Sequence, residues 1–187
     1  VIVSRTGFTN ELGWEIYIRS ENDAKKIGDL ILSEGTKMGM LLTASPGFRG
    51  RRIEAGLLSA GRDFTKDRNP FSVGLGKFID FNKGEFIGRD FLINANKECL
   101  TWGMRVENSF AKVDSDIFLN NQKIGIVTSS TWSPYQQCGV SIVHMNDKKF
   151  GPETVVDVLC DDGKVNKGEI CKLPMYDVKG DIPRGIK

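Results

Sequence analysis

The second half of the chain, from about Leu100 onward, alternates short apolar segments with turn residues. The turns recur roughly every 8 to 12 residues, which is the spacing of short strands in sandwiches and barrels. The pair Asn120-Asn121 stands between two apolar segments and predicts a hairpin, because asparagine tolerates positive φ angles. We therefore expect residues 97–187 to form a small C-terminal β-barrel.

Strand and helix signals alternate in residues 1–96. Residues 1–5 and 14–18 are apolar segments separated by a loop rich in turn residues, which predicts a hairpin-like pair of strands. Side chains alternate between the two faces of a strand. Glu15 and Tyr17 are therefore expected on the same face.

Two helices are expected after this pair. Ser20 and Asp23 resemble a capping box, and the apolar positions that follow have helical spacing until Gly35. This helix should lie on the sheet. A second helix is expected to begin at Ser45-Pro46, since proline suits the first helical turn, and to end at Gly61.

Further elements complete the first half of the chain. Residues 38–43 are an apolar run that predicts a buried strand, and residues 73–79 predict a glycine-rich strand. A short helix is expected near Gly88. The predicted fold class is α+β, with a mixed sheet and helices in residues 1–96 followed by the barrel.

Composition excludes several kinds of protein. The net charge is only +2 and no basic stripe is present, which argues against nucleic-acid binding. No apolar run has the length of a membrane span, so a cytoplasmic location is expected. The four cysteines have no CxxC spacing and predict reduced core thiols without a zinc site. The single histidine, His144, lies in an apolar strand-like stretch and is interpreted as structural.

The chain opens at Val1 without an initiator methionine and passes directly into a strand. This abrupt start predicts a fragment or a processed product.

Several segments together resemble the glycine cleavage T-protein family. Ser4–Tyr17 is similar to the family's SRTGYTGEDGFEIY, Arg52–Leu57 to its LRLEAGL, and Asn69–Arg89 to its TP…GLGW…FIGR. Gly125–Pro134 is similar to its GxVTSGxxSP, and the tail Leu173–Tyr176 to its LPFY. Their common order makes chance similarity improbable.

The resemblance implies a three-part, ring-like enzyme that holds tetrahydrofolate in a central channel. Such enzymes transfer a one-carbon unit from nitrogen or sulfur of a small substrate to N5 of the folate, without a metal. The main catalytic acid of the family belongs to an N-terminal lobe, which the resemblance implies is missing here. No catalytic residue is therefore assigned to this chain.

Glu15 matches the glutamate that binds the pterin in this family. The pterin presents two parallel donors, N3–H and the 2-amino group, and an ionised carboxylate can accept both. A solvated strand residue is the alternative interpretation of Glu15. Tyr17 shares its face and would stack on the ligand or line its channel, or else serve only as a structural tyrosine of the sheet.

The second motif departs from the family pattern ARDxLRLEAG. Phe48 stands where the family has its folate-contacting arginine, and Arg49 stands where it has an aspartate. Either Arg49 takes over the folate contact or the contact is lost. The surrounding residues resemble the branch of dimethylsulfoniopropionate demethylases, in which a methyl group leaves a sulfonium sulfur.

Arg52 and Glu54, in the same motif, are interpreted as structural, with the arginine paired to a neighbouring acid. Two functions remain open for the whole chain. It is part of a tetrahydrofolate-dependent methyl or aminomethyl transferase acting on a small amine or sulfonium. Alternatively, it is a non-catalytic folate-binding module of a flavin-dependent amine oxidase fusion.

Overall fold

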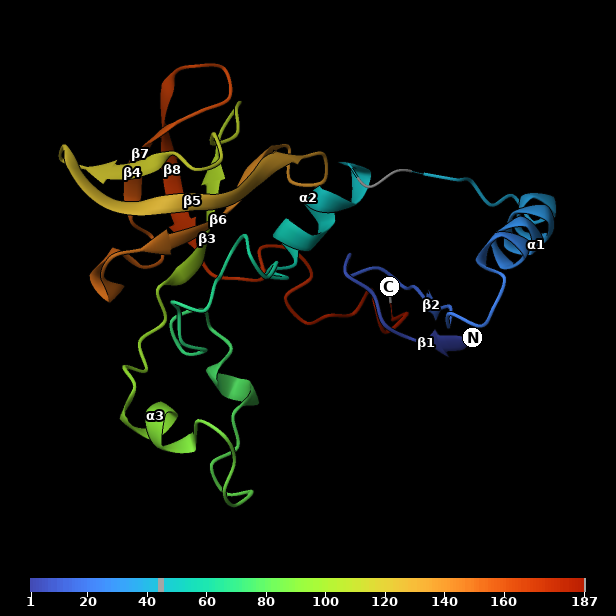
Figure 1. The fold of residues 1–187 in the computed structure, drawn as a ribbon. Helices are drawn as coiled ribbons and strands as arrows, with labels where there is room; N and C mark the ends of the chain where they lie inside the picture. Colours follow the sequence, from blue (N-terminus) through green and yellow to red (C-terminus); the bar gives the residue numbers. More distant parts are fainter. Residues whose placement is uncertain (44–45, 187) are drawn as a thin grey trace.

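The C-terminal part of the chain closes into a six-stranded antiparallel barrel (Figure 1). The structure is a computed structural model that describes residues 1–43 and 46–186. The barrel strands are β3 (Thr101–Val106), β4 (Asp116–Leu119), β5 (Gln122–Ser133), β6 (Cys138–Met145), β7 (Val155–Leu159) and β8 (Val165–Cys171). Their order around the barrel is β3-β6-β5-β4-β7-β8, and β8 pairs with β3 to close it. The prediction of an α+β chain with a C-terminal barrel is confirmed.

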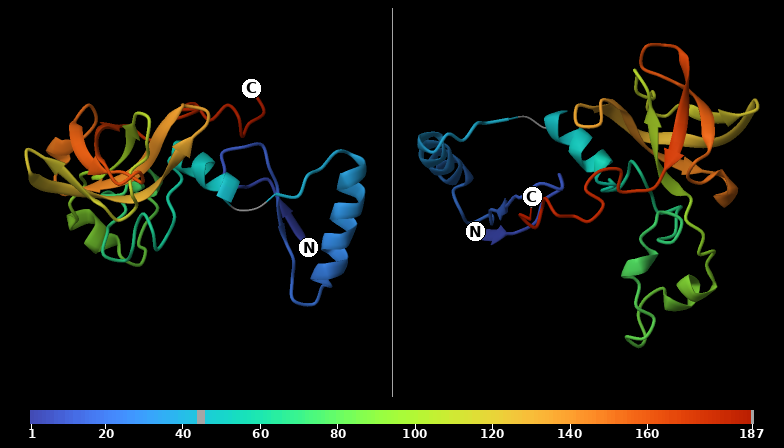
Figure 2. Two further views of the ribbon diagram at one scale, coloured as in Figure 1. Left: turned by 90° about the horizontal axis from the view of Figure 1, so that it is seen from above. Right: turned by 180° about the vertical axis from the view of Figure 1, so that it is seen from behind.

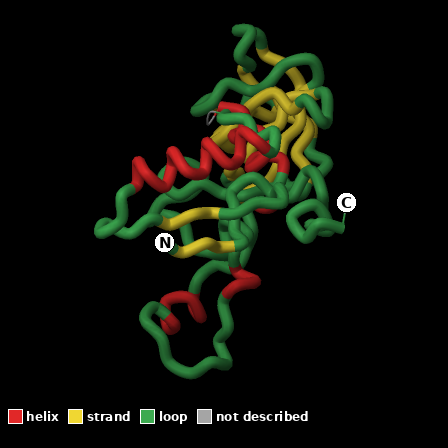
Figure 3. The backbone as a smooth tube through the Cα atoms, turned by 90° about the vertical axis from the view of Figure 1, so that its right-hand side faces the viewer, coloured by secondary structure: helices red, strands yellow, loops and turns green. Residues whose placement is uncertain are grey.

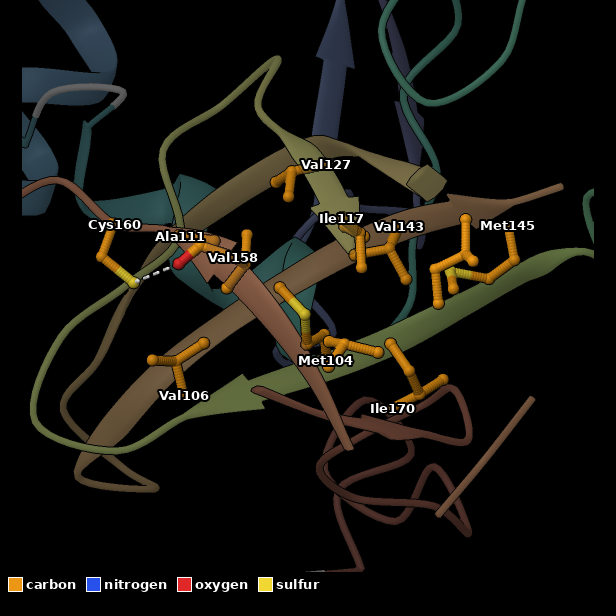
Figure 4. Packing of buried hydrophobic residues seen from close by; sticks show 12 residues of the cluster. Met104, Val106, Ala111, Ile117, Val127, Val143, Met145, Val158, Cys160 and Ile170 are labelled. Atoms are coloured by element: carbon orange, nitrogen blue, oxygen red, sulfur yellow. Dashed lines mark hydrogen bonds between the residues drawn. The ribbon is translucent and has the colours of Figure 1, made fainter. Parts of the chain in front are cut away.

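Apolar side chains fill the interior of the barrel (Figure 4). Met104, Val127, Val143 and Ile170 come from different strands and have no exposed surface. Each fully buried side chain of this size contributes about 1.5–3 kcal/mol relative to an exposed one. Closure also leaves no unpaired strand edge. The barrel therefore has a closed hydrophobic core of its own.

The hairpin between β4 and β5 forms at the predicted place. Asn120 and Asn121 have φ angles of 50° and 63°, and Leu119 pairs with Gln122 across them. Both central residues of a type I′ turn need positive φ, which asparagine accepts more readily than most residues. The prediction from Asn120-Asn121 is confirmed.

The N-terminal part contains β1 (Ile2–Ser4), β2 (Glu15–Tyr17) and α1 (Ala24–Lys37). The two strands are antiparallel, with Ile2 opposite Tyr17, as predicted. This part lies to one side of the barrel, and the C-terminal tail runs toward it (Figure 2). Figure 3 shows, in green, the long loops that lie outside the barrel.

Helix α1 differs from its prediction in three respects. Its N-cap is Asp23, whose carboxylate accepts from the amide of Lys26, so Ser20 plays no capping role. It continues through Gly35 to Lys37, and Gly39 follows with a φ of 86°. None of its residues is buried. The expected packing on the sheet is therefore wrong.

Helix α2 (Pro46–Glu54) packs on β5 and β6 of the barrel. It begins at Pro46, as predicted, while Ser45 lies outside the described residues. It ends before Gly56, whose φ of 67° suits a helix C-terminus, so the predicted end at Gly61 is wrong. Ile53 is buried on the barrel, in a second cluster with Val140 and Ile142.

The stretch between α2 and the barrel is mostly irregular. It contains a short 3₁₀ helix, η1 (Gly76–Phe78), and α3 (Arg89–Asn94). The predicted helix near Gly88 is confirmed, but residues 73–79 form no strand. Residues 38–43 form no strand either, and Leu41 is 87% exposed.

Candidate functional site

Glu15 is the first residue of β2 and lies beside two hydroxyl groups. Its Oε2 atom accepts from the hydroxyl of Thr6, across the loop between β1 and β2, and from Tyr17 Oη at 3.0 Å. These hydrogen bonds, chiefly that from Thr6, lower the pKa of the Glu15 carboxyl below its ordinary value. The side chain is therefore an ionised acceptor at neutral pH. The Tyr17 contact confirms that the two residues share a face.

A cavity of 690 Å³ opens where the β1–β2 loop, α2 and the barrel meet. Its lining combines two aromatic rings, three arginines and several hydroxyls: Phe8, Thr9, Phe48, Arg49, Arg52, Ile53, Ser59, Arg62, Val113, Ser129 and Ser130. Arg49 thus lies in the wall, whereas Glu15 and Tyr17 are not among these described lining residues. The structure does not bring the three predicted folate contacts into one cavity.

A buried ion pair forms part of this wall. Asp63 has no exposed surface and accepts from Arg52 Nη1 at 2.8 Å. It also accepts from the hydroxyls of Thr128 and Ser129 at 2.7 and 2.6 Å, and from the Ser59 amide at 2.8 Å. Every strong acceptor direction of the carboxylate is occupied. The interpretation that Arg52 pairs with a neighbouring acid is confirmed, and this pair serves structure.

The other two arginines give the cavity its positive charge. Arg49 is exposed and makes no ion pair with the described residues. Arg62 meets the exposed carboxylate of Asp114 only at 3.4 Å, a distance at which a solvated pair stabilises little. An anion that enters the cavity therefore finds at least one unpaired guanidinium.

The histidine and three of the four cysteines lie in the barrel strands or in the clusters packed on them. His144 Nδ1 is 2.9 Å from the Thr101 hydroxyl, and burial lowers its pKa to about 4. It is neutral at physiological pH and serves structure, as interpreted. All four cysteines are free thiols, and burial raises the pKa of Cys171 to about 11. A thiol with this pKa is a poor nucleophile.

Sequence reasoning missed several residues of this region. Phe8 lies in the first motif, and no sequence pattern places it in the same cavity as Phe48. Asp63 lies in the stretch after α2, and only the folded structure shows that its carboxylate accepts from Arg52. Glu11 lies four residues before Glu15 in the first motif and pairs with Arg51, a contact across 40 residues that no local spacing indicates.

Where the structure describes the chain, it contains no helix with the length and apolar character of a membrane span.

Family models match both parts of the chain. The model described as the GCVT N-terminal domain matches residues 1–83. The model described as the glycine cleavage T-protein C-terminal barrel domain matches residues 101–177. The matched ranges leave out residues 84–100, which lead into the barrel, and residues 178–187.

The curated relatives that the chain resembles are described as aminomethyltransferases. An aminomethyltransferase from Listeria welshimeri is 33% identical over 185 residues, which cover 94% of this chain and 48% of that protein. An aminomethyltransferase from Caldanaerobacter subterraneus is 35% identical over 152 residues, covering 79% of this chain and 40% of that protein. The chain thus spans about half the length of the curated relatives it matches.

A solved structure has the same fold. The crystal structure of glycine cleavage system aminomethyltransferase T from Bartonella henselae superposes with a TM-score of 0.80. The match covers 94% of this chain and 49% of that one, at 23% identity. The two family models and the curated relatives at 33% and 35% identity show that the chain belongs to the glycine cleavage T-protein family.

Proposed function

We propose that this chain forms the C-terminal half of a tetrahydrofolate-dependent one-carbon transferase. The protein moves a one-carbon unit to N5 of tetrahydrofolate, either the methyl group of a small sulfonium or amine or the carbon of an aminomethyl group, whose nitrogen then leaves as ammonia. The observation that carries the proposal is the ionised carboxylate of Glu15, held by Thr6 and Tyr17 within a motif of the family.

The geometry of Glu15 suits a donor edge. Both hydroxyls donate to Oε2, and Oε1 accepts from none of the described residues. A carboxylate has about four acceptor sites, so those on Oε1 are available to a ligand. A bidentate contact with the pterin N3–H and 2-amino group also uses Oε2. One of the two hydroxyls therefore has to turn away when the pterin binds.

Arg49 is the second proposed contact. It is unpaired in the wall of the 690 Å³ cavity, and folate carries carboxylates at the end opposite the pterin. Guanidinium groups bind carboxylates through paired, charge-assisted hydrogen bonds. We place the anionic end of the folate near Arg49 and the pterin near Glu15. Tyr17 helps to fix the Glu15 carboxylate and is the third proposed contact.

The catalytic acid is proposed to belong to the N-terminal half of the relatives. The present chain is proposed to bind and orient the folate. The donor is an amine or a sulfonium. The likeness of Arg51–Leu58, Gly61–Phe64 and Asn69–Phe71 to the demethylase branch supports a sulfonium donor. The second candidate function is a folate-binding module fused to a flavin-dependent amine oxidase.

Calorimetric titration of tetrahydrofolate into the full-length protein tests the proposal. Glu15→Gln should weaken binding roughly 10- to 100-fold, because a hydrogen bond to a charged group contributes about 1.5–3 kcal/mol. Glu21→Gln is the matched control, since Glu21 is an exposed carboxylate just beyond β2, and it should bind as the wild type does. Equal affinity of wild type and Glu15→Gln would remove the proposed function.

A further inference from the structure

Arg51 lies where four segments of the chain meet. Its Nε donates to Glu11 Oε1 at 2.6 Å, in the loop between β1 and β2, and its Nη1 pairs with Glu54 at the end of α2. The guanidinium also lies 4.2 Å from the ring centroid of Tyr135 and 4.9 Å from that of Tyr176. Only 11% of the side chain is exposed. Two carboxylates and two aromatic rings thus hold one cation.

Three of these four partners belong to the barrel or are fixed to it. Glu54 is 1% exposed and accepts from the hydroxyl of Ser133, the last residue of β5. Its backbone carbonyl accepts from the amides of Met175 and Tyr176 at 2.7 and 3.0 Å. Tyr135 lies two residues beyond the end of β5. Glu11 alone belongs to the N-terminal part, so Arg51 ties the loop at 5–14 to the barrel.

The loop has little apolar burial to hold it in place. Phe8 is 48% exposed and Leu12 is 56% exposed. Its other polar links to distant segments are a hydrogen bond from Asn10 to Asp177 at 3.1 Å and one from Arg5 to the Pro183 carbonyl at 3.1 Å. Both run to the C-terminal tail. Phe8 also lies beside α2, with its ring centroid 6.0 Å from the Arg52 guanidinium. Among the ion pairs of the described residues, the pair of Arg51 with Glu11 joins the loop to α2 and the barrel.

The same loop contacts both parts of the proposed folate site, the Glu15 carboxylate and the cavity of Arg49. Thr6 donates to the Glu15 carboxylate, and Phe8 and Thr9 line the cavity that contains Arg49. If the loop moves, the carboxylate and the cavity wall move relative to the barrel. A displacement of about 1 Å at such a site can cost up to about 100-fold in activity.

We propose that Arg51 is a positioning residue that fixes the loop at 5–14 against the barrel and so holds the folate-binding groups in register. The inference rests on the proposed function. Arg51 itself contacts no ligand and acts through Glu11. Its neighbour Arg52 does not hold the loop in this way, because the ion pair of Arg52 is with Asp63, which is buried beside the barrel.

Two measurements on the full-length protein test this inference. Arg51→Met keeps the length and helix propensity of the side chain but removes its charge. We expect tetrahydrofolate affinity to fall about 10-fold, on the order of one lost ionic hydrogen bond, with partial recovery in Arg51→Lys. The double variant with Glu11→Gln should be no weaker than Arg51→Met alone, because the contact that Glu11→Gln breaks is already lost in Arg51→Met.

Cleavage after Glu11 by a glutamate-specific protease reports on the loop without any ligand. We expect Arg51→Met to speed this cleavage about 10-fold, since freed loops are the preferred sites of nicking, while cleavage after Glu169 in β8 stays at the wild-type rate. Unchanged cleavage after Glu11, or equal acceleration at Glu169, would overturn the inference. Additive losses of affinity from Arg51→Met and Glu11→Gln would do the same.

The two proposals fail in different ways. If Glu15→Gln binds tetrahydrofolate as tightly as the wild type, the proposed function is wrong, and the positioning role fails with it even where cleavage after Glu11 accelerates. If Glu15→Gln weakens binding and Arg51→Met does not, the proposed function stands and the positioning role alone is wrong.

Discussion

The barrel and the N-terminal part are stabilised by different means. The barrel closes on itself around apolar side chains with almost no exposed surface. The N-terminal part, residues 1–43, leaves most of its large apolar residues exposed, and α1 buries none of its residues. It is attached to the rest mainly through polar contacts such as that between Arg51 and Glu11. Stability and proposed ligand binding therefore depend on different interactions.

The largest effect is expected at Asp63, which attaches the segment after α2 to the barrel. Asp63→Asn leaves the Arg52 guanidinium without its buried counter-charge, and breaking such a pair costs about 3–5 kcal/mol. Urea unfolding followed by circular dichroism measures the change. Asp114→Asn is the control, because its contact with Arg62 is exposed and should contribute less than about 1 kcal/mol. Similar losses in both variants would contradict the assignment of Asp63 to the structural core.

A pair of truncations compares the two parts directly. Ile170→Ala removes a fully buried side chain from the barrel and should cost about 2–5 kcal/mol of unfolding free energy. Leu30→Ala in α1 removes a side chain that is 61% exposed and should change stability by less than about 0.5 kcal/mol. A large loss from Leu30→Ala would show that α1 is packed in the stable protein, against the description above.

A smaller effect is expected from pH. The pKa of His144 is lowered from 6.5 to about 4 by burial, so the unfolded chain takes up a proton more readily than the folded one. Its contribution is complete above about pH 6.5 and is lost as the pH falls toward 4. Because the ring is only partly buried, the loss should be on the order of 1 kcal/mol. His144→Gln should reduce the slope of stability against pH in this window, and an unchanged slope would refute the assignment.

Sequence reasoning succeeded where the signal was local. The Asn120-Asn121 turn and the shared face of Glu15 and Tyr17 follow from φ preference and strand alternation, which act within a few residues. The barrel also followed from the regular spacing of turns. Its strand order was not predictable, because closure of β8 on β3 joins residues more than 60 positions apart.

The errors have a physical cause as well. The apolar run at 38–43 satisfies the pattern of a buried strand, but no described segment pairs with it and Leu41 stays exposed. The glycine-rich run at 73–79 bends into turns and a 3₁₀ helix instead. In the candidate site, Arg51 reaches Glu11 across 40 residues, and Asp63 accepts from Thr128 across 65 residues as well as from the nearer Arg52. Short-range spacing holds no information about such contacts.

The most direct test of the central claim changes the ligand and the protein together. A tetrahydrofolate analogue with hydrogen in place of the 2-amino group lacks one of the two donors assigned to Glu15. The wild-type protein should bind this analogue about 10-fold more weakly than tetrahydrofolate, and Glu15→Gln should bind the two ligands with nearly equal affinity. If the analogue loses as much affinity with Glu15→Gln as with the wild type, the carboxylate at position 15 does not accept the pterin edge.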